Sequence, residues 1–209
     1  MTRRVADDGA GRAAAIEVLR GGGIVALPTD TVYGIAVALG APNGIRRLFG
    51  AKGRPPDRSI GLLVADREQA ETLGVFGFVA HQLAEAHWPG GLTIVVPRRA
   101  DVELPPDLTA DAATVGLRVP DHEAPRALAA AVGPLPTTSA NRSGEPEARD
   151  ADAIDAAIGD AIDLILDGGP AGGGPASTVV DCTGPRPRVL RVGAVPVAEI
   201  EALLEPPDV

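Results

Sequence analysis

The sequence has few of the residues on which several protein classes depend. It contains one cysteine, Cys182, so an internal disulfide and a cysteine-based zinc cluster are excluded. Aromatic residues make up 2% of the chain, which leaves Ala, Val, Leu and Ile to build the core. No apolar run approaches the roughly 20 residues of a membrane-spanning helix, and the N-terminus lacks the apolar stretch of a secretory signal. These features predict a cytoplasmic protein outside the membrane.

Lysine is almost absent as well. Of the 19 basic residues, only Lys52 is a lysine, and it lies in the segment Lys52-Gly53-Arg54-Pro55. Lysine offers a compact charge on a flexible stem, which suits a phosphate oxygen or an amine with a tuned pKa. A single lysine can also fall in a loop by chance, so its position alone assigns no role.

The charge distribution argues against a broad nucleic-acid-binding face. The formal net charge is −9, whereas such faces gain affinity by neutralising phosphates. Residues 42–58 are the exception, because five basic residues stand there against one acid, Asp57. This basic segment favours a small anionic ligand, although a solvated helix end would have the same composition. The five are Arg46, Arg47, Lys52, Arg54 and Arg58.

The apolar pattern predicts an α/β fold with a twisted mixed sheet flanked by helices. Strands are expected at 24–27, 35–39, 60–64, 92–96, 114–119, 162–166, 177–182 and 189–192. Helices are expected at 8–20, 43–50, 67–73, 78–87, 123–132, 151–158 and 197–204. The order lacks a strict strand–helix rhythm, which favours a mixed sheet. With no internal repeat or long linker, residues 1–209 are expected to form one domain.

Four polar segments are expected to connect strands to their neighbours, and they are the candidates for chemistry. They are residues 27–34, 52–55, 136–144 and 167–178, and two arginines, Arg118 and Arg191, end nearby strands. Hydroxyl, amide and glycine-rich loops of this kind can bind a polar ligand. They can equally satisfy turn backbone, cap a helix or form a flexible surface loop. The glycine-rich segment 168–175 is the candidate for a lid, on composition alone.

Familiar nucleotide and metal templates are missing. Lys52 is followed by Gly53 and Arg54, so there is no Walker-type phosphate loop, and no Gly-x-Gly-x-x-Gly follows a strand. The three histidines have no metal-ligand spacing, and no nucleophile–base pair stands out. A phosphate site in this chain would therefore be of an unconventional kind.

Taken together, the polar segments resemble the YrdC-type family of threonylcarbamoyl-AMP synthases. Six motifs carry the resemblance, in family order and over nearly the whole chain. They are Leu27–Gly34, Lys52-Gly53-Arg54-Pro55, Trp88-Pro89-Gly90-Gly91-Leu92-Thr93, Gly116-Leu117-Arg118-Val119-Pro120, Thr138-Ser139-Ala140-Asn141-Arg142-Ser143-Gly144, and Ser177-Thr178-Val179-Val180-Asp181.

The resemblance implies a single α/β domain whose twisted sheet curves around a basic cleft, with the motifs within about residues 10–193. It also implies an enzyme that converts L-threonine, bicarbonate and ATP into threonylcarbamoyl-AMP and pyrophosphate. Magnesium would accompany ATP; no separate metal site is assigned, and both a magnesium held by ATP alone and one that also contacts Ser139 or Asn141 stay open. A partner transferase would pass the threonylcarbamoyl group to the adenosine beside the tRNA anticodon, and a weak direct contact with tRNA is allowed.

The resemblance also implies roles for individual residues. The catalytic residues would be Lys52 and Arg54, which would hold ATP phosphates together with Ser139, Asn141, Ser143 and Arg191. The threonine and carbamate side would consist of Thr29, Thr31, Arg118 and Ser177.

Two departures from the family pattern concern the substrate side. Many relatives have Pro-Leu where this chain has Ser59-Ile60-Gly61, and some have a histidine near the end of the strand that reads Leu62-Leu63-Val64 here. Relatives with a second C-terminal domain exist, and this chain resembles the short form. Two alternatives stay open: a YrdC-fold paralogue acting on another carbamoyl adenylate, and a non-catalytic RNA-binding module. The acidic charge and the few aromatic residues weigh against the second.

Overall fold

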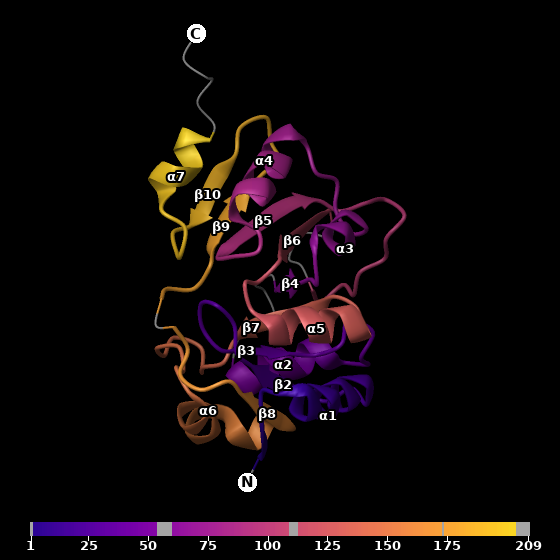
Figure 1. The fold of residues 1–209 in the computed structure, drawn as a ribbon. Helices are drawn as coiled ribbons and strands as arrows, with labels where there is room; N and C mark the ends of the chain where they lie inside the picture. Colours follow the sequence, from indigo (N-terminus) through magenta and orange to yellow (C-terminus); the bar gives the residue numbers. More distant parts are fainter. Residues whose placement is uncertain (1, 54–59, 109–112, 173, 204–209) are drawn as a thin grey trace.

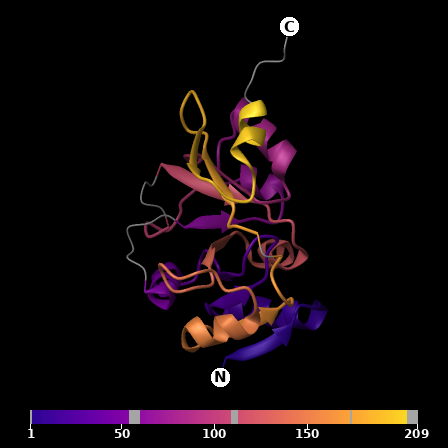
Figure 2. The same cartoon turned by 90° about the vertical axis from the view of Figure 1, so that its left-hand side faces the viewer.

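The computed structural model describes residues 2–53, 60–108, 113–172 and 174–203. In these ranges ten strands form one mixed sheet, in the order β1-β8-β2-β3-β7-β4-β6-β5-β9-β10. The strands are stacked from β8, near the N-terminus, to β10 at the opposite end of the molecule (Figure 1). The side view places α1 and α6 at one end of this stack and α4 and α7 at the other (Figure 2). The predicted α/β fold with a mixed sheet is confirmed.

The predicted helices and strands are all present, with ends that differ by a few residues. The strands are β1 (Arg3–Ala6), β2 (Val25–Leu27), β3 (Gly34–Ala36), β4 (Gly61–Leu63), β5 (Leu92–Pro97), β6 (Thr114–Arg118), β7 (Leu135–Ser139), β8 (Leu164–Asp167), β9 (Thr178–Asp181) and β10 (Arg188–Arg191). The helices are α1 (Gly9–Arg20), α2 (Gly44–Lys52), α3 (Arg67–Glu71), α4 (Phe78–His87), α5 (Glu123–Val132), α6 (Ala151–Ile158), the short η1 (Gly159–Ala161) and α7 (Val197–Ala202).

Strand β7 (Leu135–Ser139) corrects the prediction that the segment 136–144 is a loop throughout. It pairs antiparallel with β3 and β4, at the centre of the sheet. A proline argues against a central strand because it cannot donate to the ladder. Pro136 is accommodated where the β3 ladder ends: its carbonyl accepts from the Val37 amide at 3.3 Å, just beyond the last paired residue, Ala36. Because Pro136 has no N–H, one backbone hydrogen bond is lost at the end of the β3–β7 ladder.

Strand β1 was also missed by the sequence analysis. It is an edge strand that pairs in parallel with β8 alone, and its two arginines are exposed. Val5 is its one half-buried residue against the core, so β1 is too short in apolar residues to show the alternation that identifies a half-buried strand.

The sheet separates two cores. On β2, Val25 and Leu27 face one core and Ala26 faces the other, as the period of two in a strand requires. Helices α1 and α5 cover the Val25 side, and α2, α4, α6 and α7 contribute to the core on the Ala26 side. Asp8 caps the N-terminus of helix α1: its carboxylate accepts a hydrogen bond from the Gly11 amide at 2.8 Å. None of the helices in the described ranges is long and apolar enough to span a membrane.

Truncating Leu19 tests whether α1 is held by its buried face. Leu19 is fully buried against the α5 side of the sheet, so Leu19→Ala should lower the free energy of unfolding by about 2–5 kcal/mol. Chemical denaturation followed by circular dichroism measures this change. Leu190→Ala is the matched control, because Leu190 is 56% exposed, and its free energy of unfolding should change by less than about 1 kcal/mol. Equal losses in the two variants would contradict the assigned packing.

Candidate functional site

One face of the central sheet forms the floor of a cleft of about 560 Å³. The floor is a row of residues in register on neighbouring strands: Thr137, Gly61, Gly116, Val95 and Asp181. The residues that alternate with them pack into the core behind the sheet: Leu62, Leu117, Ile94 and Val180. The same alternation that builds the core therefore builds the floor.

The loop between β2 and β3 forms one wall, and its hydroxyls are bonded to each other. The Thr29 hydroxyl donates to the Val32 carbonyl at 2.7 Å and accepts from the amides of Thr31 and Val32 at 3.1 and 3.3 Å. The two threonine hydroxyls also lie 3.1 Å apart. Both threonines are buried and line the cleft. Thr29 therefore shapes the turn, and Thr31 links the turn to β6.

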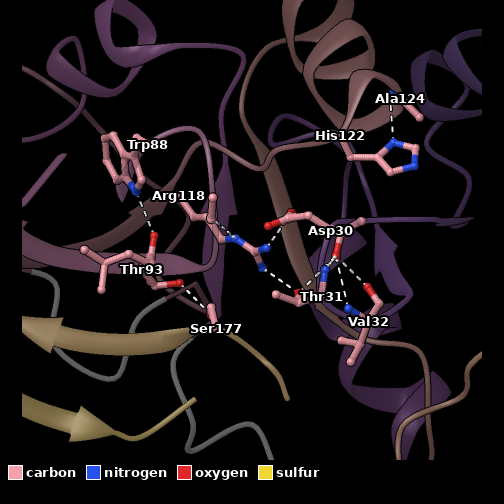
Figure 3. A network of polar contacts seen from close by, with 12 residues as sticks. Asp30, Thr31, Val32, Trp88, Thr93, Arg118, His122, Ala124 and Ser177 are labelled. Atoms are coloured by element: carbon pink, nitrogen blue, oxygen red, sulfur yellow. Dashed lines mark hydrogen bonds and ion pairs between the residues drawn. The ribbon is translucent and has the colours of Figure 1, made fainter. Parts of the chain in front are cut away.

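Arg118 is the centre of this wall (Figure 3). Its Nη2 donates to Asp30 Oδ1 at 2.6 Å, its Nη1 to the Thr31 hydroxyl at 3.0 Å, and its Nε to the Gly90 carbonyl at 2.9 Å. In the figure Asp30 and Thr31 lie on one side of the guanidinium, and Thr93 and Ser177 on the other. A guanidinium has five N–H groups, so within the described chain two remain for a ligand in the cleft that Arg118 lines.

Burial and pairing both act on Arg118. The side chains of Arg118 and Asp30 are 8% and 16% exposed. Burial lowers the pKa of the Arg118 guanidinium, and the charge and hydrogen bond of Asp30 oppose that change. Because arginine begins from such a high value, it stays a cation, held in a fixed orientation by three acceptors.

Lys52 lies at the other side of the cleft, behind the end of β7. Its ammonium donates to the Ser139 carbonyl at 2.5 Å, the Ser139 hydroxyl at 3.0 Å and Asn141 Oδ1 at 2.7 Å. The lysine is 4% exposed, and of this cluster only Ser139 lines the cleft. Arg54, the predicted partner of Lys52, lies outside the described residues.

Asn141 and Ser143 fix the loop that leaves β7. Asn141 Oδ1 accepts from the Ser139 hydroxyl at 2.6 Å, and its Nδ2 donates to the Glu145 carbonyl at 2.6 Å. The Ser143 amide donates to the Lys52 carbonyl at 2.9 Å, and the residue is exposed. Both residues are next to the Lys52 cluster, but neither contributes to the described lining.

Ser177 and Arg191 join β9 and β10 at the far wall. The Ser177 hydroxyl lies 2.8 Å from that of Thr93 and accepts from Arg191 Nη2 at 3.0 Å. Arg191 Nε and Nη2 also donate to the Ser177 carbonyl, at 3.0 and 2.8 Å. Burial lowers the pKa of Arg191, the charge of Arg118 lowers it further, and Glu147 opposes both.

Four charged residues at the cleft were given no role from the sequence: Asp30, Glu147, Asp181 and Arg188. Glu147, Asp181 and Arg188 line the cleft, and Asp30 is paired with Arg118. Arg188 pairs with Asp181 at 2.8 Å. Burial by itself would raise the pKa of Asp181, but hydrogen bonds from Arg188 and Thr183 together lower it. The adjacency of Asp30 to two candidate threonines was a usable signal, whereas Glu147 and Arg188 stand outside the matched motif residues.

Tyr33 connects the cleft wall to the glycine-rich segment. Its hydroxyl donates to the Gly169 carbonyl at 2.6 Å and accepts from the Gly168 amide at 3.0 Å. Gly169 has a φ of 80°, which favours glycine. The start of this segment is therefore tied to the loop that carries Thr29 and Thr31.

The chemistry of the cleft is that of fixed cations and hydroxyls. Three arginines and two carboxylates belong to its described lining, with Lys52 behind it and Asp30 beside it. Burial raises the pKa of Cys182 to about 11, so this thiol is neutral at pH 7. Within the described ranges no group of three or more His, Cys, Asp or Glu side chains could hold a metal ion. Such a cleft can orient an anionic or zwitterionic ligand between two polar walls.

Comparison with known proteins gives the class to which this fold and cleft belong. The model of the Sua5, YciO and YrdC family, described as "Telomere recombination", matches residues 17–193. The chain therefore belongs to this family, and the family predicted from the six motifs is confirmed.

Relatives within the family extend the comparison. A protein of Mycobacterium leprae, provisionally named a threonylcarbamoyl-AMP synthase, is 40% identical over 196 residues, 93% of this chain and 88% of that protein. The threonylcarbamoyl-AMP synthase of Bacillus subtilis is 38% identical over 93% of this chain and 56% of its own length. The structure of P. abyssi Sua5 complexed with L-threonine has a TM-score of 0.88 and 35% identity, over 98% of this chain and 60% of that one. The chain thus spans somewhat more than half of the latter two proteins.

A double-mutant cycle tests the Arg118–Asp30 pair. Removing one partner of a buried ion pair leaves the other charge uncompensated, so Asp30→Ala should lower the free energy of unfolding by about 3–5 kcal/mol. Arg118→Met and the double variant Arg118→Met/Asp30→Ala complete the cycle. The coupling energy between the two side chains should exceed about 1 kcal/mol. The exposed pair Arg46–Asp107, with side chains 68% and 34% exposed, is the matched control and should couple by at most about 1 kcal/mol. Chemical denaturation measures all variants, and no coupling at Arg118–Asp30 would contradict the pair.

Proposed function

We propose that this protein is a threonylcarbamoyl-AMP synthase, which joins L-threonine, bicarbonate and ATP. One observation carries the proposal. A single face of the sheet presents an oriented arginine, Arg118, on one side and a hydroxyl backed by a lysine, Ser139 with Lys52, on the other. That arrangement suits a ligand with a carboxylate at one end and phosphates at the other. The activity named for the B. subtilis relative supports this choice.

The reaction requires two anions to be held together. The threonine amine takes up bicarbonate with loss of water to give a carbamate, and a carbamate oxygen then attacks the α-phosphorus of ATP. The bond between that phosphorus and the bridging oxygen breaks, and pyrophosphate leaves. Positioning and fixed positive charge lower the barrier of such a phosphoryl-centre displacement, and no covalent enzyme intermediate is needed.

On the amino-acid side, Arg118 would bind the threonine carboxylate with its two remaining N–H groups. Thr31 is bonded to the same guanidinium, and Thr29 fixes the turn that carries Thr31. Ser177, bonded to Thr93 and Arg191, would offer its hydroxyl to the amino acid or its carbamate. L-threonine in the P. abyssi Sua5 complex supports an amino-acid site in this fold.

On the phosphate side, Ser139 would contact the ATP phosphates directly. Lys52 supplies positive charge behind that hydroxyl and orients it together with Asn141. Ser143 would act through its bond to the Lys52 backbone, and Arg191 would reach the adenylate phosphate. The assignment of Arg54 to the phosphates rests on the Lys52-Gly53-Arg54-Pro55 motif. Magnesium would enter as part of the ATP complex.

The product implies a second enzyme. Threonylcarbamoyl-AMP is a reactive mixed anhydride, so a transferase would pass its acyl group to the tRNA adenosine beside the anticodon. A weak contact of this protein with tRNA and a cytoplasmic location belong to the same proposal.

Pyrophosphate release from ATP with bicarbonate tests the function. L-threonine should stimulate release, and mass spectrometry should show threonylcarbamoyl-AMP. L-serine, glycine and no amino acid are the comparisons. Release that needs none of these amino acids would favour a paralogue with another carbamoyl acceptor. RNA binding without any turnover of ATP would favour a binding module.

Replacing the one lysine tests the phosphate side. Lys52→Ala removes the charge behind Ser139 and one hydrogen-bond donor to each of the Ser139 and Asn141 side chains, so threonine-dependent pyrophosphate release should fall by roughly 100-fold or more. Arg46→Ala is the control, since Arg46 is an exposed cation on the same helix, and it should keep nearly the wild-type rate. Circular dichroism checks that both variants are folded. A folded Lys52→Ala variant with wild-type turnover would contradict the assignment.

A further inference from the structure

Two glycines in the middle of the cleft floor are not required by the packing around them. A Cβ on Gly61 of β4 would lie 3.6 Å from the Gly116 carbonyl oxygen, and one on Gly116 of β6 would lie 3.6 Å from Thr93 Cγ2. Both are ordinary van der Waals distances, and neither glycine has a positive φ. Glycine weakens a strand interior, because it loses more conformational freedom on folding and packs no side chain.

Other glycines of the sheet region show what a packing requirement looks like. A Cβ on Gly34 of β3 would lie 2.7 Å from Thr137 Cγ2, and one on Gly74 would lie 2.4 Å from Val96 Cγ2. At those positions the protein itself occupies the space of a side chain. At Gly61 and Gly116 that space belongs to the cleft.

The two glycines also lie between the proposed ligand anchors. Arg118 follows Gly116 by two residues on β6, and Ser139 follows Thr137 by two residues on β7. Because β7 runs antiparallel to β4, while β4 and β6 are parallel, Arg118 and Ser139 lie diagonally across the Gly61–Gly116 pair. Strands are about 4.8 Å apart and rise about 3.3 Å per residue, so a ligand that reaches both anchors crosses the glycines.

We propose that Gly61 and Gly116 form the seat of the reacting centre, with the carbamoyl group and α-phosphate lying directly on their backbone. This inference rests on the proposed synthase function. It adds that the two glycines determine how close to the sheet the ligand lies. Leu63 and Val95 border the seat, so the space over the glycines has apolar flanks and a side-chain-free floor. A methyl group on either glycine would lift the carbamate away from the phosphorus that it attacks.

Alanine substitutions separate this role from a structural one. Gly61→Ala and Gly116→Ala should leave the thermal unfolding midpoint unchanged or raise it, because the Cβ fits and the strand gains propensity. The kcat/KM for threonine-dependent pyrophosphate release should fall by roughly tenfold or more in each variant, and further in Gly116→Val. Gly9→Ala, at the start of α1 with no atom within 4 Å of the added Cβ, is the matched control and should keep both the midpoint and the activity.

The outcomes distinguish this inference from the function on which it rests. A wild-type protein without threonine-dependent activity would overturn the proposed function, and the seat with it. An active wild type whose Gly61→Ala and Gly116→Ala variants keep the same kcat/KM would overturn the glycine seat alone. A large drop in the unfolding midpoint of both variants would also overturn it, because the glycines would then serve the packing.

Discussion

The register between β7, β4, β6 and β5 determines both the core and the cleft. Because side chains alternate across a sheet, a slip of one residue would turn the floor residues Thr137 and Val95 into the core and bring the buried residues Leu62 and Ile94 to the cleft. The burial of the apolar set behind the sheet therefore also fixes the polar set in front of it. The same strand register therefore determines both the packing of the core and the lining of the cleft.

The charges of the cleft follow a second constraint, which is that buried cations need acceptors. Arg118 is held by Asp30, Thr31 and Gly90, and Lys52 by Ser139 and Asn141. These contacts fix the two cations in place before any ligand arrives, so little reorganisation is required on binding. The overall charge of −9 does not prevent such a site, because the field that a ligand meets is set by its nearest groups.

Much of the fold could be predicted from the sequence, because its elements carry strong local signals. Helices α4, α5 and α6 have the predicted bounds. Strand β7 was hidden by Pro136 and by a run of threonine and serine that is typical of loops, and its pairing partners are distant in sequence. The six motifs located most of the cleft, yet they could not show that Lys52 lies behind Ser139 instead of in the lining, since that depends on how α2 meets β7. Glu147 and Arg188 reach the cleft through tertiary placement alone.

We infer that one face of the sheet holds the amino acid and the phosphates at opposite sides of a glycine floor. A crystal structure with L-threonine and a non-hydrolysable ATP analogue tests it most directly. We expect the threonine carboxylate on Arg118, a phosphate oxygen on Ser139, and ligand atoms in contact with the backbone of Gly61 and Gly116. Threonine bound away from Arg118, or a ligand that leaves the space over the two glycines empty, would contradict it.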